Sequence, residues 1–354
     1  MTVSRRSFLQ GSAAAGLIAA TGLPGSPANA QTEDSPIPLG ESLFFTVRAD
    51  AGQHGHLGHA RFTTTETAQH IVELVEDCHA RDDDVGHTCS RLTPVPAGAA
   101  SLEVLNSTNG PLTIALFGTQ QPRQTRQSPL STIDFIGIPV VSRAGWGADE
   151  ALMTWNTEFS PTQLITVHHT ASPTGFEPEY IGNYPEAVRS IYHFHATNSG
   201  RGWGDIGYHF LIDPDGTIYQ GRCTGANEVP LLQPESPLGA GAEIVTAGHV
   251  YGANAGNIGI CLIGNFMQTA PTTRAFSALR RLTDALCHAL ELDPGSDVRY
   301  VSPSTRREAV KPTLSGHRDW ADYAGVTECP GNLLADRLNE IRTPRFTATG
   351  SFTS

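Results

Sequence analysis

The feature of this 354-residue sequence that most constrains its fold is an alternation of apolar strands and helical segments from Phe135 onward. Short apolar runs between turn residues indicate buried strands, whereas apolar residues spaced three and four apart indicate a helix. Strands interleaved with helices predict an α/β domain over residues 135–345, with a central mixed β-sheet flanked by helices. The strands are expected at Gln163–His169, Ile206–Ile212, Thr217–Gln220 and Ile258–Ile263, and the helices at Asn183–Phe194, Arg274–Leu290 and Asn332–Ile341.

Two local signals mark where these elements begin and turn. Asn183 is the expected N-cap of the first helix, with Pro185 in the first turn and Glu186 three residues after the cap. This combination is typical of a helix start, because proline is tolerated in the first turn and glutamate can complete a capping box. The turn-forming residues Asp213-Pro214-Asp215-Gly216 separate two strands, which predicts a β-hairpin.

The first thirty residues have the three-part layout of a signal peptide. Arg5-Arg6 stand just before an apolar pair, a weakly hydrophobic Ala/Gly-rich stretch runs from Gly11 to Leu23, and Ala28-Asn29-Ala30 offers an A-x-A cleavage site. The twin arginine is typical of twin-arginine export. The alternative is a transmembrane helix, which needs about 20 strongly apolar residues. We expect cleavage near Ala30 and a secreted, periplasmic or cell-wall protein without stable membrane insertion.

Residues 31–118 differ in pattern from the rest of the chain. They contain short β-prone segments bounded by Gly, Pro, Asn or Asp, such as Ser42–Val47, Ser101–Leu105 and Leu112–Phe117. This pattern predicts a small β-rich accessory domain, for which wall binding, regulation and structural support are all open roles. Residues 119–134 are rich in Gln, Arg, Pro and Ser and are expected to form a linker, and residues 346–354 a flexible tail.

The charge balance limits the partners and the catalytic groups. The chain carries 23 Lys and Arg against 35 Asp and Glu, a formal net charge of −12. An acidic balance argues against nucleic acid as a partner. Lys311 is the only lysine, so no other lysine can act in catalysis.

Six cysteines allow disulfides, because an exported protein folds in or enters an oxidising compartment. Cys78 and Cys89 are close enough in sequence to bridge. Cys287 lies on the apolar stripe of a predicted helix and Cys261 lies inside an apolar strand, so both are expected to be core thiols. Cys329 is a different case, because it precedes Pro330-Gly331 in a segment with other candidate functional residues.

Three positions could bind one metal ion. They are the pair His168-His169 at the end of a strand, His317, and Cys329. Imidazole nitrogens and a thiolate are ligands that zinc prefers, and three protein ligands leave a coordination position for water. Side chains alternate along a strand, so only one of the two adjacent histidines can reach the metal, and spacing alone does not say which.

These residues lie in blocks that resemble the peptidoglycan recognition protein and type-2 N-acetylmuramoyl-L-alanine amidase family. The resemblance covers about residues 139–341 and does not include 31–135. Arg318–Glu328 is longer than the corresponding stretch of the phage lysozyme-type amidases, and Val229–Ile244 is longer than is usual in the family. Both departures bear on substrate specificity more than on reaction type. The matching blocks are Val141–Gly147, Thr166–Ala171, Arg201–Phe210, Asp215–Arg222, Ala247–Asn254, Asn257–Ile260, Ile263–Phe266, Gly316–Asp319 and Thr327–Gly331.

The resemblance implies a role for each matching position. It places the zinc ligands, for one Zn²⁺ per chain, on His168, His317 and Cys329. It places the catalytic tyrosine on Tyr208 and a residue that stabilises the reacting oxygen on Thr327. It implies substrate contacts for His249, Asn254 and Trp203, against the alternatives that His249 packs beside the metal and that Trp203 is structural.

The function that the resemblance implies is an exported zinc-dependent amidase that hydrolyses the amide between the N-acetylmuramoyl group and L-Ala of peptidoglycan. Its partners would be peptidoglycan or muropeptide fragments. Amide hydrolysis needs an activated water and a stabilised oxyanion, and zinc assists with both. Two alternatives remain: a non-catalytic peptidoglycan-binding protein, which the presence of Cys329 disfavours, and a cysteine peptidase with Cys329 at a helix N-terminus as nucleophile.

Overall fold

The structure is a computed structural model that describes the sequence in segments. These are residues 28–30, 36–39, 44–49, 57–64, 68–74, 76, 89–96, 98–105, 107, 112–117, 130–171, 182–198, 200–225 and 229–343. The twin arginine, Cys78, residues 119–129 of the expected linker and the expected tail lie outside the described residues.

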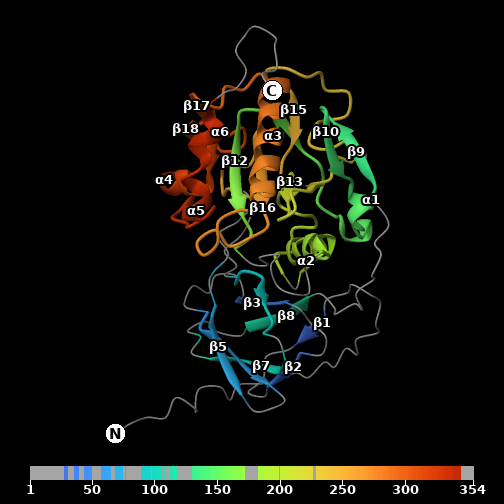
Figure 1. The fold of residues 1–354 in the computed structure, drawn as a ribbon, viewed down its shortest axis with the longest axis vertical. Helices are drawn as coiled ribbons and strands as arrows, with labels where there is room; N and C mark the ends of the chain where they lie inside the picture. The colour runs from blue at the N-terminus through green and yellow to red at the C-terminus, as the bar shows by residue number, and fades with distance from the viewer. Residues whose placement is uncertain are drawn as a thin grey trace.

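A seven-stranded mixed sheet forms the centre of the C-terminal region (Figure 1), which confirms the expected α/β class. Its central strands are parallel, and antiparallel pairs lie toward one edge, where two tight turns join strands that are adjacent in sequence. In spatial order the strands are β19 (Leu314–Gly316), β12 (Leu164–His169), β16 (Asn257–Leu262), β13 (Phe210–Ile212), β14 (Ile218–Gln220), β10 (Ile138–Val141) and β9 (Thr132–Phe135). Two small antiparallel sheets pair β11 (Phe159–Pro161) with β15 (Glu243–Val245), and β17 (Asp297–Val301) with β18 (Glu308–Pro312).

Helices cover both faces of this sheet. The helix α3 (Thr273–Ala289) packs its apolar stripe on one face, where it meets odd-numbered β12 residues such as Ile165 and Val167. The helix α2 (Tyr184–Ala196) packs on the other face, and ten of its thirteen residues are buried. Because side chains alternate along a strand, the even-numbered residues of β12 face the α2 side.

The hairpin and most strand and helix bounds agree with expectation, but three details differ. The strand β13 begins at Phe210 rather than Ile206, because the Gly207 amide donates to the His195 ring instead of to a ladder. The expected final helix divides into α5 (Asn332–Ala335) and α6 (Leu338–Arg342), joined by an i→i+3 bond from the Arg337 amide to the Leu334 carbonyl. Asn183 occupies the N-cap of α2, but its side chain makes no capping bond.

The sheet also reaches further toward the N-terminus than expected. The strand β9 begins at Thr132, inside the range 119–134 that was expected to be a linker. It pairs antiparallel with β10 through the tight turn at Ile136-Gly137, and Ile133 packs against the main core. Pairing with a neighbouring strand therefore overrides the polar composition of this stretch.

The N-terminal region is β-rich, as expected, and its apolar residues form a core of their own. Its strands form two four-stranded sheets, and Phe45 meets Phe62 edge to face between them. Removal of residues 1–30 would delete the first of these strands. One sheet has the order β1 (Ala28–Ala30), β8 (Leu112–Phe117), β3 (Phe44–Ala49) and β6 (Thr93–Pro94), and the other β2 (Ile37–Pro38), β7 (Ala99–Leu105), β4 (His59–Thr64) and β5 (Gln69–Glu73).

This region contacts the helix α2 of the larger domain (Figure 1). Leu92 and Ala115 share one apolar cluster with α2 residues. Arg48 Nη1 donates to the carbonyl oxygen of Asn198, just after the helix, at 2.5 Å. The helix α2 is therefore buried from two sides, by the seven-stranded sheet and by the N-terminal strands.

Two cysteines that the sequence places in the core, Cys261 and Cys287, are buried in the structure. Cys287 is a free, buried thiol in the main core, and burial raises its pKa to about 12. Cys261 is buried on the α2 side of the sheet. Because Cys78 is not described, its pairing with Cys89 stays a prediction. No helix in the described part of the chain is long and apolar enough to cross a membrane.

Candidate metal centre

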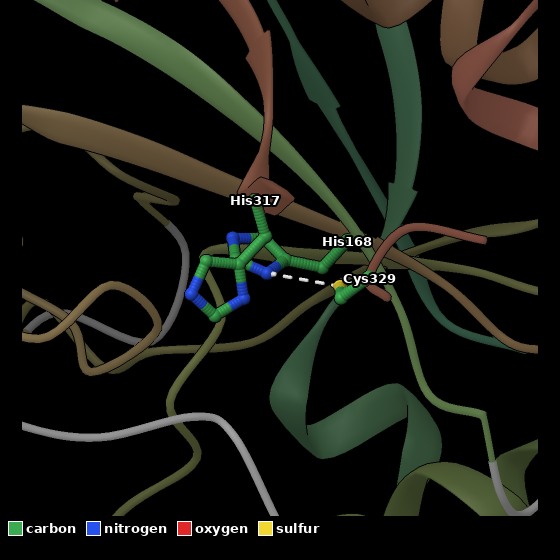
Figure 2. A group of neighbouring side chains, drawn as sticks. All are labelled: His168, His317 and Cys329. Carbon is green, nitrogen blue, oxygen red and sulfur yellow. Dashed lines mark hydrogen bonds between the residues drawn. The ribbon is translucent and has the colours of Figure 1, made fainter. Parts of the chain in front are cut away.

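Three side chains from separate parts of the chain meet at one end of the sheet (Figure 2). His168 lies near the end of β12, His317 begins the short helix η3 (His317–Trp320), and Cys329 precedes α5. The strands β12 and β19 are parallel, with Val167 opposite Gly316, so their next residues emerge side by side. Among the described residues, these three form a group whose ligand atoms lie within 4.8 Å of one another, and all three are buried.

The sheet decides between the two adjacent histidines. His168 is even-numbered and faces the α2 side, where its Nδ1 lies 3.6 Å from Cys329 Sγ and its ring centroid 4.8 Å from that of His317. The ring of His169 faces the opposite side and accepts a hydrogen bond from the Phe266 amide. His169 meets the cysteine through its backbone amide, 3.4 Å from Cys329 Sγ.

Backbone contacts hold the loop that carries Cys329. The Thr327 hydroxyl accepts a hydrogen bond from the Cys329 amide at 3.0 Å, and the Cys329 carbonyl accepts one from the Arg318 amide at 2.8 Å. Thr327 is partly exposed, so it shapes the turn and also lies at the surface beside the three buried side chains. Both interpretations of this threonine, turn former and donor to a substrate, fit its position.

The long stretch Arg318–Glu328 folds back on the domain instead of extending away from it. It forms the end of η3 and the helix α4 (Ala321–Ala324), and Trp320 and Tyr323 pack edge to face against each other and around Tyr300. The Lys311 ammonium donates to the Asp319 carbonyl at 2.7 Å and pairs with Asp322. The buried rings of Trp320 and Tyr323 thus anchor this stretch to the domain, and the two residues that flank it, His317 and Cys329, stay together.

The donor set fits a zinc ion. Two imidazoles and one thiol from buried residues converge, which matches the nitrogen and sulfur ligands that zinc takes at three-ligand sites. Calcium and magnesium prefer oxygen ligands, and the three converging side chains offer none.

Tyr208 lies beside this group. It is 2 % exposed, and its ring centroid is 5.6 Å from that of His168 and 5.4 Å from that of His195. The backbone around it is fixed on both sides, since Gly207 bonds to His195 and the His209 amide donates to the Gly259 carbonyl. The phenol is therefore held next to the candidate ligand ring of His168 by a segment that is hydrogen-bonded on both sides.

The expected substrate contacts occupy interior positions. Trp203 is 3 % exposed and lies between the Arg201 guanidinium and the His195 ring, which favours the structural alternative because a sugar platform needs an open ring face. Asn254 is fully buried, and its Oδ1 accepts hydrogen bonds from the amides of His249 and Val250. His249 is also fully buried and contacts His168 directly.

A buried ionic cluster near Tyr208 was not expected from the sequence. Asp205 accepts from Arg143 Nη1 at 2.9 Å and from Arg222 Nη1 at 2.8 Å, and the side chains of all three residues are 0 % exposed. Asp205 also accepts from the amides of Ile206 and Cys223. Its signal in the sequence was an acidic residue between Gly204 and Ile206 in an otherwise apolar stretch.

The profile of the N-acetylmuramoyl-L-alanine amidase family matches residues 158–332, which include all three candidate ligands. Peptidoglycan-recognition protein SC1a of Drosophila melanogaster is 30% identical over 206 residues, which cover 58% of this chain and 85% of that protein. The chain belongs to this family. Its N-terminal region lies outside the family match.

Other relatives cover a similar share of the chain. The human N-acetylmuramoyl-L-alanine amidase is 30% identical over 218 residues, 61% of this chain and only 30% of that longer protein. The solved structure of Drosophila PGRP-LB is 26% identical, covers 60% of this chain and 97% of its own, and superposes with a TM-score of 0.40.

Proposed function

We propose that this protein is a zinc-dependent N-acetylmuramoyl-L-alanine amidase, which hydrolyses the amide between the N-acetylmuramoyl group and L-Ala of peptidoglycan. The observation that carries the proposal is the convergence of His168, His317 and Cys329 at the end of the parallel strands. A family member that only bound peptidoglycan would have no need of a complete set of three ligands. The set supports catalysis for that reason.

Two residues of the protein would stabilise the oxyanion that forms during hydrolysis. Zinc, when bound, supplies Lewis-acid activation of water and of the amide carbonyl. Tyr208 lies beside His168 and would donate its phenolic proton in a hydrogen bond to the developing oxyanion. Thr327, at the surface of the cysteine loop, would donate a second hydrogen bond to the same oxygen.

We also propose that the protein is exported. The twin arginine, the Ala/Gly-rich stretch and the A-x-A sequence support twin-arginine transport and cleavage near Ala30. Peptidoglycan lies outside the cytoplasmic membrane, so export and the proposed substrate agree. The contact of the N-terminal strands with α2 supports a structural role for residues 31–118.

Chelation tests the metal and the reaction together. Purified sacculi incubated with the zinc-loaded protein should release free stem peptides, and a strong chelator should lower the rate by at least about 100-fold, because Lewis-acid activation contributes several kcal/mol. Added zinc should restore the rate. Mass spectrometry of the released peptides identifies the bond. Tight binding to sacculi without release by the zinc-loaded protein would instead establish the non-catalytic alternative.

Replacing Tyr208 by phenylalanine should lower kcat by about 100- to 1000-fold, the usual cost of one lost oxyanion donor. Zinc content, measured by atomic spectrometry, should stay the same because the ring beside His168 is retained. Tyr219→Phe is the matched control, since Tyr219 is equally buried and bonds to Asp213. An equal kcat for the two variants would remove Tyr208 from the mechanism.

A further inference from the structure

The ring of His249 forms a hydrogen-bonded relay behind one of the candidate ligands. His168 Nε2 lies 3.0 Å from His249 Nδ1, and His249 Nε2 lies 3.0 Å from the carbonyl oxygen of Asn257. The other ring nitrogen of His168, Nδ1, points to Cys329 Sγ (Figure 2). A series of hydrogen bonds therefore connects the Asn257 carbonyl of β16, through the His249 and His168 rings, to the candidate metal position.

The chemistry of the partners fixes the protons along this line. A carbonyl oxygen can only accept, so His249 Nε2 carries the hydrogen. A His168 ring that ligates a metal through Nδ1 keeps its hydrogen on Nε2, and this nitrogen faces His249 Nδ1. His168 Nε2 must then be the donor. Its Nδ1 is left as a lone pair directed at the position that His317 and Cys329 also face.

The residues around His249 hold its ring in this orientation. The ring packs on Gly259, where an added Cβ would lie 2.6 Å from His249 Cδ2, so a side chain at Gly259 would displace the ring. Asn254 fixes the backbone by accepting from the His249 and Val250 amides. The neighbouring His209 ring is held between the Val245 carbonyl and the Gly259 amide.

His209 also limits the charge in this region. Burial lowers its pKa to about 4, although the hydrogen bond to the Val245 carbonyl opposes the shift. The ring is therefore neutral at physiological pH and adds no positive charge beside His249, whose ring centroid lies 5.7 Å away. A cationic neighbour would have opposed metal binding at His168.

We infer that His249 is a positioning residue for the metal, which holds His168 in the Nε2–H tautomer with Nδ1 ready to ligate, and that it does not contact substrate. The inference rests on the proposed zinc site. It assigns His249 a role that differs from the substrate contact implied by resemblance, because the ring is fully buried and both of its nitrogens are directed to protein groups. Hydrogen bonds of this kind orient ligating histidines and raise their basicity.

Two variants separate the hydrogen bonds from simple packing. His249→Leu removes both, whereas the amide of His249→Gln can accept from His168 and donate to Asn257. Zinc dissociation constants are measured by competition with a chromophoric chelator. We expect His249→Leu to bind zinc about 10- to 100-fold more weakly than the parent protein, and His249→Gln to bind within a fewfold of it. Equal affinity of the leucine variant, or an equal loss in both variants, would overturn the inference.

A measurement on the unmodified protein covers the case in which the leucine variant does not fold. Nitrogen-15 NMR of the zinc-free protein distinguishes protonated from unprotonated ring nitrogens. We expect His168 and His249 each to carry the ring hydrogen on Nε2. A His249 ring protonated at Nδ1 would contradict the relay. Failure of the unmodified protein to bind zinc at all would instead refute the proposed function, so the two failures are distinguishable.

Discussion

Replacing Cys329 by serine should reduce peptide release from sacculi by about 1000-fold or more while the protein stays folded. The serine hydroxyl is a poor zinc ligand, and loss of the metal removes several kcal/mol of transition-state stabilisation, each 1.4 kcal/mol of which is worth a factor of ten. Rates are measured with zinc present, and circular dichroism checks the fold. Cys287→Ser is the matched control, because Cys287 is also a buried thiol but lies on α3, in the main core.

A second substitution at the same position separates the metal from a cysteine nucleophile. Both mechanisms lose activity when Cys329 becomes serine, but a carboxylate can bind zinc and cannot replace a thiolate nucleophile in a peptidase. Cys329→Asp should therefore retain bound zinc and more activity than the serine variant. If the aspartate variant binds zinc but is as inactive as the serine variant, the sulfur itself is required, which favours the cysteine peptidase.

Replacing Asp205 by asparagine should lower the free energy of unfolding by roughly 3 to 5 kcal/mol. The substitution leaves Arg143 and Arg222, whose side chains are fully buried, without the carboxylate that bonds both. Two cations close together in the interior repel each other and lose their common partner. Urea unfolding followed by tryptophan fluorescence gives the midpoint, and an unchanged slope confirms that stability rather than the denatured state has changed.

The same chemical change at the surface is the control for this prediction. Asp215 pairs with Arg274 at 3.1 Å, but both side chains are more than half exposed. Asp215→Asn should cost no more than about 1 kcal/mol, because solvent screens an exposed pair. If the two asparagine variants unfold at the same urea concentration, the Asp205 cluster does not stabilise the fold as described.

The larger domain could be predicted in outline because its elements have strong local signals. Leu164–His169 is a short strand with apolar residues at Leu164, Ile165 and Val167, and Thr273–Ala289 carries an apolar stripe at helical spacing. The residues at which these elements begin and end depended on contacts with residues far away in the sequence. Tyr208 was expected within a strand, but the Gly207 amide bonds to His195 on α2, so the strand begins only at Phe210.

The sequence by itself determined the residue types at the candidate metal centre, two imidazoles and a thiol, and the family that supplies their expected roles. Only the tertiary structure decided which of His168 and His169 faces the other two, since alternation separates the pair but does not say which face meets β19 and the cysteine loop. It likewise placed His249 against His168, in the packing position that the sequence had left open as the alternative to a substrate contact. Both outcomes depend on the register of parallel strands joined by long connections, and residues far apart in sequence carry no local signal of that register.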